Sequence, residues 1–136
     1  MQIIIAEDDH DDRVLIEDAL LENGIDAKVT TFVKDGEELM ELLNATKKLP
    51  SIILLDLNMP KKDGRQTLVE IRDDARLKHI PIIIYTTSQA EEDIKLSYKH
   101  GSNTYFTKPS KFSELVELIA SIKSYWFDNA KLGKEK

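Results

Sequence analysis

Five side chains that could act together in chemistry follow or end short apolar runs in this chain. Two carboxylates, Glu7 and Asp8, come after the first run, and a third, Asp56, comes after another. A hydroxyl, Thr86, and an ammonium, Lys108, stand at the ends of two further runs. A nucleophilic carboxylate, a hydrogen-bond donor and a positive charge are the groups that phosphoryl transfer to a carboxylate needs. The sequence therefore suggests phosphate chemistry at the place where these ends meet.

The apolar runs alternate with segments of helical periodicity, which indicates alternating strands and helices. Strands are predicted at residues 2–6, 27–32, 52–56, 81–85 and 103–107. Helices are predicted at about residues 10–23, 35–45, 64–75, 90–99 and 111–126. Three of the strands are nearly continuous in Ile and Leu, as expected when helices cover both faces of a sheet. The pattern predicts an α/β fold with a doubly wound, five-stranded parallel sheet and right-handed crossovers.

The carboxyl ends of parallel strands share one edge of the sheet, where ligands bind. If the first and third strands are neighbours, their axes lie about 4.8 Å apart, which brings Asp8 and Asp56 close together. Two unit charges about 4 Å apart repel by roughly 4 kcal/mol at an effective dielectric constant of about 20. Either a cation relieves this repulsion or a pKa rises. Because the candidate ligands are oxygens, Mg²⁺ is the expected ion.

The expected reaction is in-line attack by Asp56 on a phosphoryl group, which gives an aspartyl phosphate. Mg²⁺ and Lys108 would neutralise the phosphoryl oxygens, and Thr86 would donate a hydrogen bond to one of them. Three carboxylates would then face the two charges of the metal and the one ammonium. We therefore expect this edge of the sheet to be nearly neutral and able to accept a phosphoryl group.

Composition narrows the class of protein. The chain has 136 residues, 41% of them hydrophobic and 32% charged, with a formal net charge of −6 and a pI near 5.1. This acidity argues against nucleic acid or anionic membranes as partners. The chain has no cysteine, which suits the cytoplasm, and no segment predicts a signal peptide or a membrane span. We expect one cytoplasmic domain over residues 1–127 and a flexible tail over residues 128–136.

The other acids near the first run have an ordinary structural explanation. Asp9 is predicted to cap a helix, and Asp11 and Asp12 are predicted to lie in its first turn, where negative charge favours the helix dipole. The three histidines lack the spacing of metal ligands and are expected on the surface. None of these residues is therefore assigned to the site.

Aromatic residues gather near the end of the last predicted helix. An apolar stripe at residues 112, 115, 116, 119, 122 and 126 predicts a helix packed on the core. The triplet Tyr125, Trp126 and Phe127 exceeds what a small domain can bury, so an exposed aromatic cluster is expected there. This cluster suggests a homodimer that forms through the last helix.

Together these motifs resemble the receiver domain of two-component response regulators. The resemblance rests on IIIAED at 3–8, LLDLNMP at 54–60, TT at 86–87 and TKP at 107–109, and it covers about residues 2–126. It implies a flavodoxin-like (βα)5 fold with strand order 2-1-3-4-5. It also implies a signalling protein rather than an enzyme, with a histidine kinase or phosphotransfer protein as phosphodonor. Output to an unknown protein would use the fourth helix, the fifth strand and the fifth helix.

The resemblance assigns roles at the phosphorylation site. Asp56 matches the phosphoacceptor, and Glu7 and Asp8 match the acidic pair, with Asp8 binding Mg²⁺ directly and Glu7 acting through water. The backbone carbonyl of Asn58 would be a further ligand. Lys108 matches the family's lysine, and the peptide bond that follows it matches a position that is usually cis in receivers.

The resemblance also assigns a switch. Thr86 and Tyr105 match a coupled pair in which the hydroxyl moves toward the phosphoryl group and the aromatic ring turns inward behind it. Thr87 stands where a smaller residue is frequent, and Ser88 stands where the side chain often tunes phosphoryl lifetime. A closer likeness is to single-domain regulators that partner phytochrome-type histidine kinases. It rests on EDDHDDR at 7–13, PKKDGR at 60–65, LKHIP at 77–81 and SYWF at 124–127.

Two other functions use the same features of the sequence. A small phosphohydrolase with an aspartyl nucleophile would need the same carboxylate, hydroxyl, lysine and metal. Such enzymes usually carry Asp-x-Asp on the first strand, however, and the chain is too short for a substrate cap. A degenerate receiver would serve as a constitutive interaction module, which the intact set of five side chains argues against.

Overall fold

A parallel sheet of five strands forms the centre of the molecule. The computed structural model describes residues 2–131. The strands run in the order β2-β1-β3-β4-β5 and all pair in parallel, as the sequence and the resemblance predict. Their bounds are β1 Ile3–Ala6, β2 Thr30–Val33, β3 Ile52–Leu55, β4 Ile82–Thr86 and β5 Thr104–Thr107.

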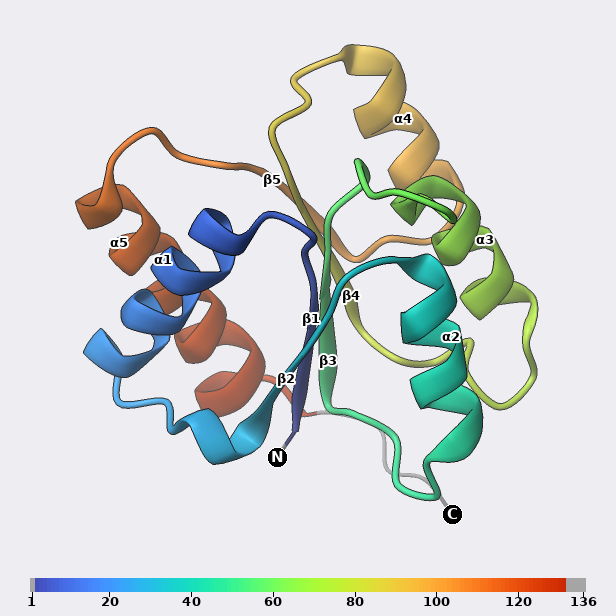
Figure 1. Ribbon diagram of the computed structural model, residues 1–136, viewed down its shortest axis with the longest axis horizontal. Helices are drawn as coiled ribbons and strands as arrows, with labels where there is room; N and C mark the ends of the chain where they lie inside the picture. Colours follow the sequence, from blue (N-terminus) through green and yellow to red (C-terminus); the bar gives the residue numbers. More distant parts are fainter. Residues whose placement is uncertain (1, 132–136) are drawn as a thin grey trace.

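Helices cover both faces of the sheet. One side holds α1 and α5, and the other holds α2, α3 and α4 (Figure 1). The helices span α1 His10–Glu22, α2 Gly36–Ala45, α3 Gly64–Asp73, α4 Glu91–Lys99 and α5 Phe112–Ile122. A short 3₁₀ helix, η1 Ala27–Val29, precedes β2, and a π-helical segment, η2 Lys123–Asn129, continues α5. The predicted doubly wound α/β fold is confirmed.

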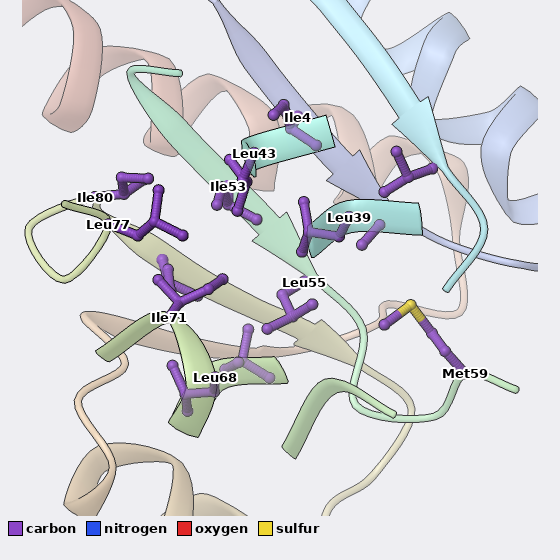
Figure 2. Close-up of a cluster of buried hydrophobic side chains, with 14 of the residues drawn as sticks. Ile4, Leu39, Leu43, Ile53, Leu55, Met59, Leu68, Ile71, Leu77 and Ile80 are labelled. Atoms are coloured by element: carbon purple, nitrogen blue, oxygen red, sulfur yellow. The ribbon is translucent and has the colours of Figure 1, made fainter. Parts of the chain in front are cut away.

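Each layer of helices packs on its own hydrophobic core. Because side chains alternate along a strand, Ile4 points to one face of the sheet and Ile3 and Ile5 point to the other. Figure 2 shows the core under α2 and α3, where Ile4, Ile53 and Leu55 meet helix residues such as Leu39 and Leu68. The opposite core receives Ile16, Leu20, Leu115 and Ile119 from α1 and α5. Burial on both faces fixes the sheet between two packed layers.

Register brings the functional ends of the strands to one edge. Ala6 pairs with Leu55, so the residues that follow them, Glu7 and Asp56, are neighbours. Backbone hydrogen bonds continue past the strands: the N–H of Asp56 donates to the carbonyl of Ala6 at 3.1 Å. The N–H of Lys108 likewise donates to the carbonyl of Thr86 at 2.7 Å. The backbone ladder therefore positions the site.

Aspartate side chains begin three of the helices beside this edge. Asp9, Asp35 and Asp63 each accept a hydrogen bond from the backbone N–H three residues later. This satisfies one of the free N–H groups at each helix start. The predicted cap at Asp9 is thus confirmed, and it fixes where α1 begins, directly after the acidic pair.

Two predicted boundaries are wrong. Residues 27–29, expected to begin the second strand, form η1 because the side chain of Asp26 accepts a hydrogen bond from the N–H of Lys28 and closes a turn. The last α-helix, expected to reach residue 126, ends at Ile122 and passes into η2, which runs to Asn129. Residues 128 and 129 thus belong to this segment, and residues 132–136 of the expected tail lie outside the described residues.

The expected exposed aromatic cluster is mostly incorrect. Trp126 and Phe127 are partly buried and pack against the core formed by α1 and α5. Tyr125 is 62% exposed, and its ring meets that of Trp126 edge to face at 5.0 Å between centroids. Phe112, predicted to face the core, is exposed at the start of α5. The core therefore buries more of this aromatic triplet than the small size of the domain suggested.

Gly64, the first residue of α3, approaches the backbone of Asp56 too closely for a side chain. A Cβ at this position would lie 2.2 Å from the carbonyl oxygen of Asp56 and 2.8 Å from the Cα of Leu57. The neighbouring atoms are backbone held by the sheet, so they have little freedom to move. The glycine lets the start of α3 rest directly on the loop that carries Asp56.

We predict that Gly64→Ala lowers the free energy of unfolding by about 2 kcal/mol or more, because overpacked buried positions cost about 1–3 kcal/mol. Gly24→Ala is the matched control: nothing lies within 4 Å of its Cβ, but its φ of +72° is strained for alanine. That control should lose about 1 kcal/mol. Urea unfolding of both variants measures the two costs, and equal losses would contradict the close approach at Gly64.

Candidate phosphorylation site

The five side chains singled out in the sequence lie together at the carboxyl edge of the sheet. One carboxylate oxygen from each of Glu7, Asp8 and Asp56 falls within 4.8 Å of the others. Glu7 and Asp56 are buried, whereas Asp8 is exposed. The hydroxyl of Thr86 is buried at the end of β4, and Lys108 follows β5. The geometry thus assembles the group of side chains that the sequence predicted.

Lys108 is the positive centre of this site. Its Nζ lies 2.6 Å from Oε1 of Glu7, 2.8 Å from Oδ2 of Asp12 and 3.0 Å from Oδ2 of Asp56. The side chain is only 10% exposed, and burial alone would lower the pKa of the ammonium. The three carboxylates outweigh burial and raise this pKa above its ordinary value. Lys108 therefore stays charged and binds three acids at once.

Glu7 is the deepest carboxylate of the site. Burial, the largest cause, raises its pKa to about 7, and the charge of Asp56 adds to the rise, while Lys108 opposes it. Its Oε1 pairs with Lys108 at 2.6 Å without well-aligned hydrogen-bond geometry. Its Oε2 accepts a hydrogen bond from the N–H of Asp9 at 3.2 Å. A buried carboxylate with so little hydrogen bonding favours a nearby cation.

The two oxygens of Asp56 have different partners. Oδ1 accepts a hydrogen bond from the backbone N–H of Asn58 at 3.0 Å, and Oδ2 accepts one from Lys108 at 3.0 Å. The amide of Asn58 also donates to the hydroxyl of Thr86 at 3.4 Å. These contacts orient Asp56 at the edge of the sheet. That the carbonyl of Asn58 is a metal ligand stays a prediction.

Tyr85 lies beneath the ammonium of Lys108. The Nζ stands 5.7 Å from the centroid of its ring, a distance that allows a cation–π contact. Burial of the phenol, the main cause, raises the pKa of Tyr85 to about 12. The phenol therefore stays protonated near neutral pH, and its ring offers Lys108 a neutral aromatic surface.

Tyr105 lies on the same face of the sheet as Thr86. It pairs with Ile84, two residues before Thr86, and its ring packs partly buried against the core under α2 and α3. Its hydroxyl donates a hydrogen bond to the carbonyl of Ser88 at 2.9 Å. The two expected switch residues are thus joined by the start of the loop that follows β4.

The expected cis peptide bond between Lys108 and Pro109 is absent. The described residues contain no cis peptide bond, so this bond is trans. The trans form is the intrinsically favoured one before proline, by about 0.5–1 kcal/mol. Lys108 reaches the site with this bond in the trans form, and its backbone N–H donates to the carbonyl of Thr86.

Asp12 is a member of the site that sequence reasoning missed. It lies in the first turn of α1, as predicted, but its side chain also binds Lys108. The sequence carries no local signal for this contact, because it joins the start of α1 to a lysine 96 residues further along the chain. The site therefore holds four carboxylates and one ammonium, so a divalent cation would leave it with one negative charge instead of nearly neutral.

The donor set fits a hard divalent cation. The three clustered ligands, Glu7, Asp8 and Asp56, are all carboxylates, two of them buried. Oxygen ligands suit Mg²⁺ and Mn²⁺ better than metals that prefer sulfur or imidazole. The exposure of Asp8 leaves an open side from which an ion and a phosphate could enter.

Comparison with known proteins agrees with this geometry. Residues 3–120 match the response regulator receiver domain family. The response regulator Rcp1 of Synechocystis sp. is 36% identical over 135 residues, which cover 96% of this chain and 91% of Rcp1.

Two solved structures share the fold along nearly their whole length. One is the phosphorylated cyanobacterial phytochrome response regulator RcpA, with a TM-score of 0.88, 38% identity and 98% of each chain covered. The other is the Mn²⁺-bound form of Rcp1, with a TM-score of 0.86, 35% identity and coverage of 96% of this chain and 97% of Rcp1. The chain therefore belongs to the response regulator receiver domain family.

Proposed function

We propose that this protein is a stand-alone response regulator that accepts a phosphoryl group on Asp56 with the help of Mg²⁺. The phosphodonor is a phosphohistidine of a histidine kinase or a phosphotransfer protein. The observation that carries the proposal is the placement of Asp56, a buried carboxylate that lies beside Lys108 and within reach of Glu7 and Asp8. A phosphorylated structure of RcpA and an Mn²⁺-bound structure of Rcp1 support it by similarity.

The geometry suggests a role for each side chain in transfer. An oxygen of Asp56 attacks phosphorus in line, the new P–O bond forms as the donor P–N bond breaks, and the departing imidazole takes a proton from solvent. The ammonium of Lys108 pairs with Asp56 before transfer and with a phosphoryl oxygen as the negative charge moves onto it. Thr86 donates a hydrogen bond to another phosphoryl oxygen. Asp8, Asp56 and the backbone carbonyl of Asn58 would hold Mg²⁺, with Glu7 acting through water, and the ion would neutralise part of the phosphoryl charge.

The protein acts in signalling and is not a turnover enzyme. Receiver domains are typically signalling modules, and the family match therefore favours this role over that of a phosphohydrolase. The protein's own catalysis is limited to its phosphorylation by the donor and to slow hydrolysis of the acyl phosphate. Among the described residues no helix is long and apolar enough to cross a membrane. We place the protein in the cytoplasm, with no nucleic acid or membrane as partner.

A hydrogen-bonded chain links the switch residues to the proposed output helices. Arg65 of α3 donates two hydrogen bonds of 2.8 Å to the carboxylate of Asp93 in α4. The hydroxyl of Ser88 donates to the same carboxylate at 2.6 Å, and the carbonyl of Ser88 accepts from Tyr105. Because this loop begins directly after Thr86, movement of Thr86 toward a phosphoryl group would pull on α4. We infer that α4, β5 and α5 form the surface that switches.

This surface, together with η2, which continues α5, is our proposed homodimer interface. Exposed aromatic side chains lie in the elements that flank or follow β5: Tyr98 in α4, Phe112 in α5 and Tyr125 in η2. Aromatic residues of this kind supply much of the affinity of protein interfaces. Trp126 and Phe127 are not part of this argument, because they pack on the core.

We predict that Asp56→Asn abolishes labelling by radioactive acetyl phosphate in the presence of Mg²⁺, because the nucleophilic oxygen is lost. The wild type should take up close to one acid-stable phosphoryl group per chain. Asp11→Asn, which removes an exposed carboxylate from the start of α1, is the control and should label like the wild type. Labelling of the Asp56 variant at the wild-type rate would rule out the assignment, and rapid multiple turnover of phosphate monoesters would indicate a hydrolase instead.

A second prediction concerns pH and the pair of Arg65 and Asp93. Hydrogen bonds from Arg65, the main cause, and from Ser88 lower the pKa of Asp93 from 3.8 to about 2. The charged carboxylate therefore stabilises the fold above about pH 4, and this contribution is lost as the pH falls through 2. Because the side chain of Arg65 is 39% exposed, solvent screening limits the contribution to about 1 kcal/mol.

Asp93→Asn should therefore lower the free energy of unfolding by about 1 kcal/mol at pH 7, and the difference from the wild type should shrink below about pH 4. Urea unfolding at several pH values measures this difference. Glu92→Gln, an exposed acid in the same helix turn, is the control for the helix dipole. A difference that stays constant down to pH 2.5 would contradict the role of the charged pair.

For the interface, we predict that Tyr125→Ser weakens self-association of the phosphorylated protein at least about tenfold, as loss of an important interface aromatic does. Sedimentation velocity over a range of concentrations measures the dimer. Leu21→Ser on α1 is the control, because Leu21 is 59% exposed, close to the 62% of Tyr125. A monomer before and after phosphorylation, or equal effects of the two variants, would refute the proposed interface.

A further inference from the structure

Lys108 binds more acids than the proposed reaction needs. An ammonium has three N–H donors, and in this chain they face three carboxylates at 2.6–3.0 Å. Two of these acids, Glu7 and Asp56, also belong to the group of oxygens that fits a metal ion. The third, Asp12, does not belong to that group. Lys108 and a divalent cation therefore compete for Glu7 and Asp56, whereas Asp12 is available to Lys108 alone.

The position of Asp12 is fixed by the fold. Its backbone N–H donates to the side chain of Asp9 at 2.9 Å, and one turn later α1 is anchored in the core by Ile16, which is buried. Its side chain is 33% exposed, compared with 10% for Lys108, so the pair lies at the outer side of the site. Asp12 thus offers Lys108 a stationary partner on α1, away from the deepest carboxylate.

From this geometry we propose that Asp12 is a positioning residue for Lys108. When a divalent cation enters, Asp12 holds the ammonium on the α1 side while Glu7 and Asp56 turn their oxygens to the ion. The ammonium remains near Asp56 and can pair with a negatively charged phosphoryl oxygen there. This inference rests on the metal site of the proposed function.

The proposal predicts a definite direction for loss of the Asp12 charge. Without the Asp12 charge, Lys108 interacts more strongly with Glu7 and Asp56. The cation then competes less well for these two carboxylates. The site also loses one negative charge, which weakens cation binding further. Asp12→Asn should therefore weaken binding of Mg²⁺, and of Mn²⁺, by about three- to tenfold, the range expected for a partly exposed ion pair.

The test is isothermal titration of the full chain with MgCl₂ and MnCl₂, without any phosphodonor. Asp11→Asn is the matched control, because Asp11 lies in the same first turn, is exposed, and carries the same charge. It should change affinity by less than about twofold, as expected for a solvent-screened charge. Thermal unfolding of both variants checks that the fold is retained.

A double-mutant cycle with Lys108→Gln separates positioning from charge. Removal of the competing ammonium should tighten metal binding, and in that background Asp12→Asn should lose most of its effect and keep only the part due to its lost charge. An Asp12 effect that persists unchanged without Lys108 would overturn the proposal.

The outcomes distinguish this inference from the function on which it rests. If the wild type binds neither ion, the proposed metal site and the role of Asp12 both fail. If the wild type binds them, and Asp12→Asn matches Asp11→Asn or binds more tightly, only the role of Asp12 is overturned. A selective, Lys108-dependent loss of affinity supports it.

Discussion

Electrostatic repulsion among carboxylates is the constraint on which the site depends. The parallel register places Glu7 and Asp56 on adjacent strand ends, and the backbone ladder keeps them there. The free energy of core packing therefore holds together charges that would separate in water. Lys108 relieves part of this repulsion and binds three of the acids. The raised pKa of Glu7, about 7, reflects burial that the ammonium alone does not offset.

The sequence predicted those features that follow from local pattern and fold class. Continuous runs such as residues 3–5 indicated strands buried on both faces, and alternation of strands and helices then required a parallel sheet. Once the sheet was parallel, the residues after its strands had to meet at one edge. This is why Asp56 and Lys108 could be picked out before any geometry was known, although their separate roles stay predictions.

Other features depend on contacts between distant segments and have no local signal. Asp12 has the usual appearance of a helix-start acid, and its contact with Lys108 joins residues 96 apart. Trp126 and Phe127 look surplus in the sequence, yet the space beside α1 accommodates them. The start of the second strand was predicted too early, because residue type favours a strand at residues 27–29. A hydrogen bond from the backbone N–H of Lys28 to the side chain of Asp26 closes a turn there instead.

The missing side chain at Gly64 has a mechanical consequence. The absence of a side chain lets the start of α3 lie against the backbone of Asp56. The next residue, Arg65, donates two hydrogen bonds to Asp93 of α4. A second path to Asp93 runs through the loop after Thr86, by way of Ser88. The two paths meet at Asp93, one from the backbone of Asp56 and the other from Thr86. Because both paths end on one carboxylate of α4, a displacement at Asp56 and one at Thr86 would reach α4 through the same residue.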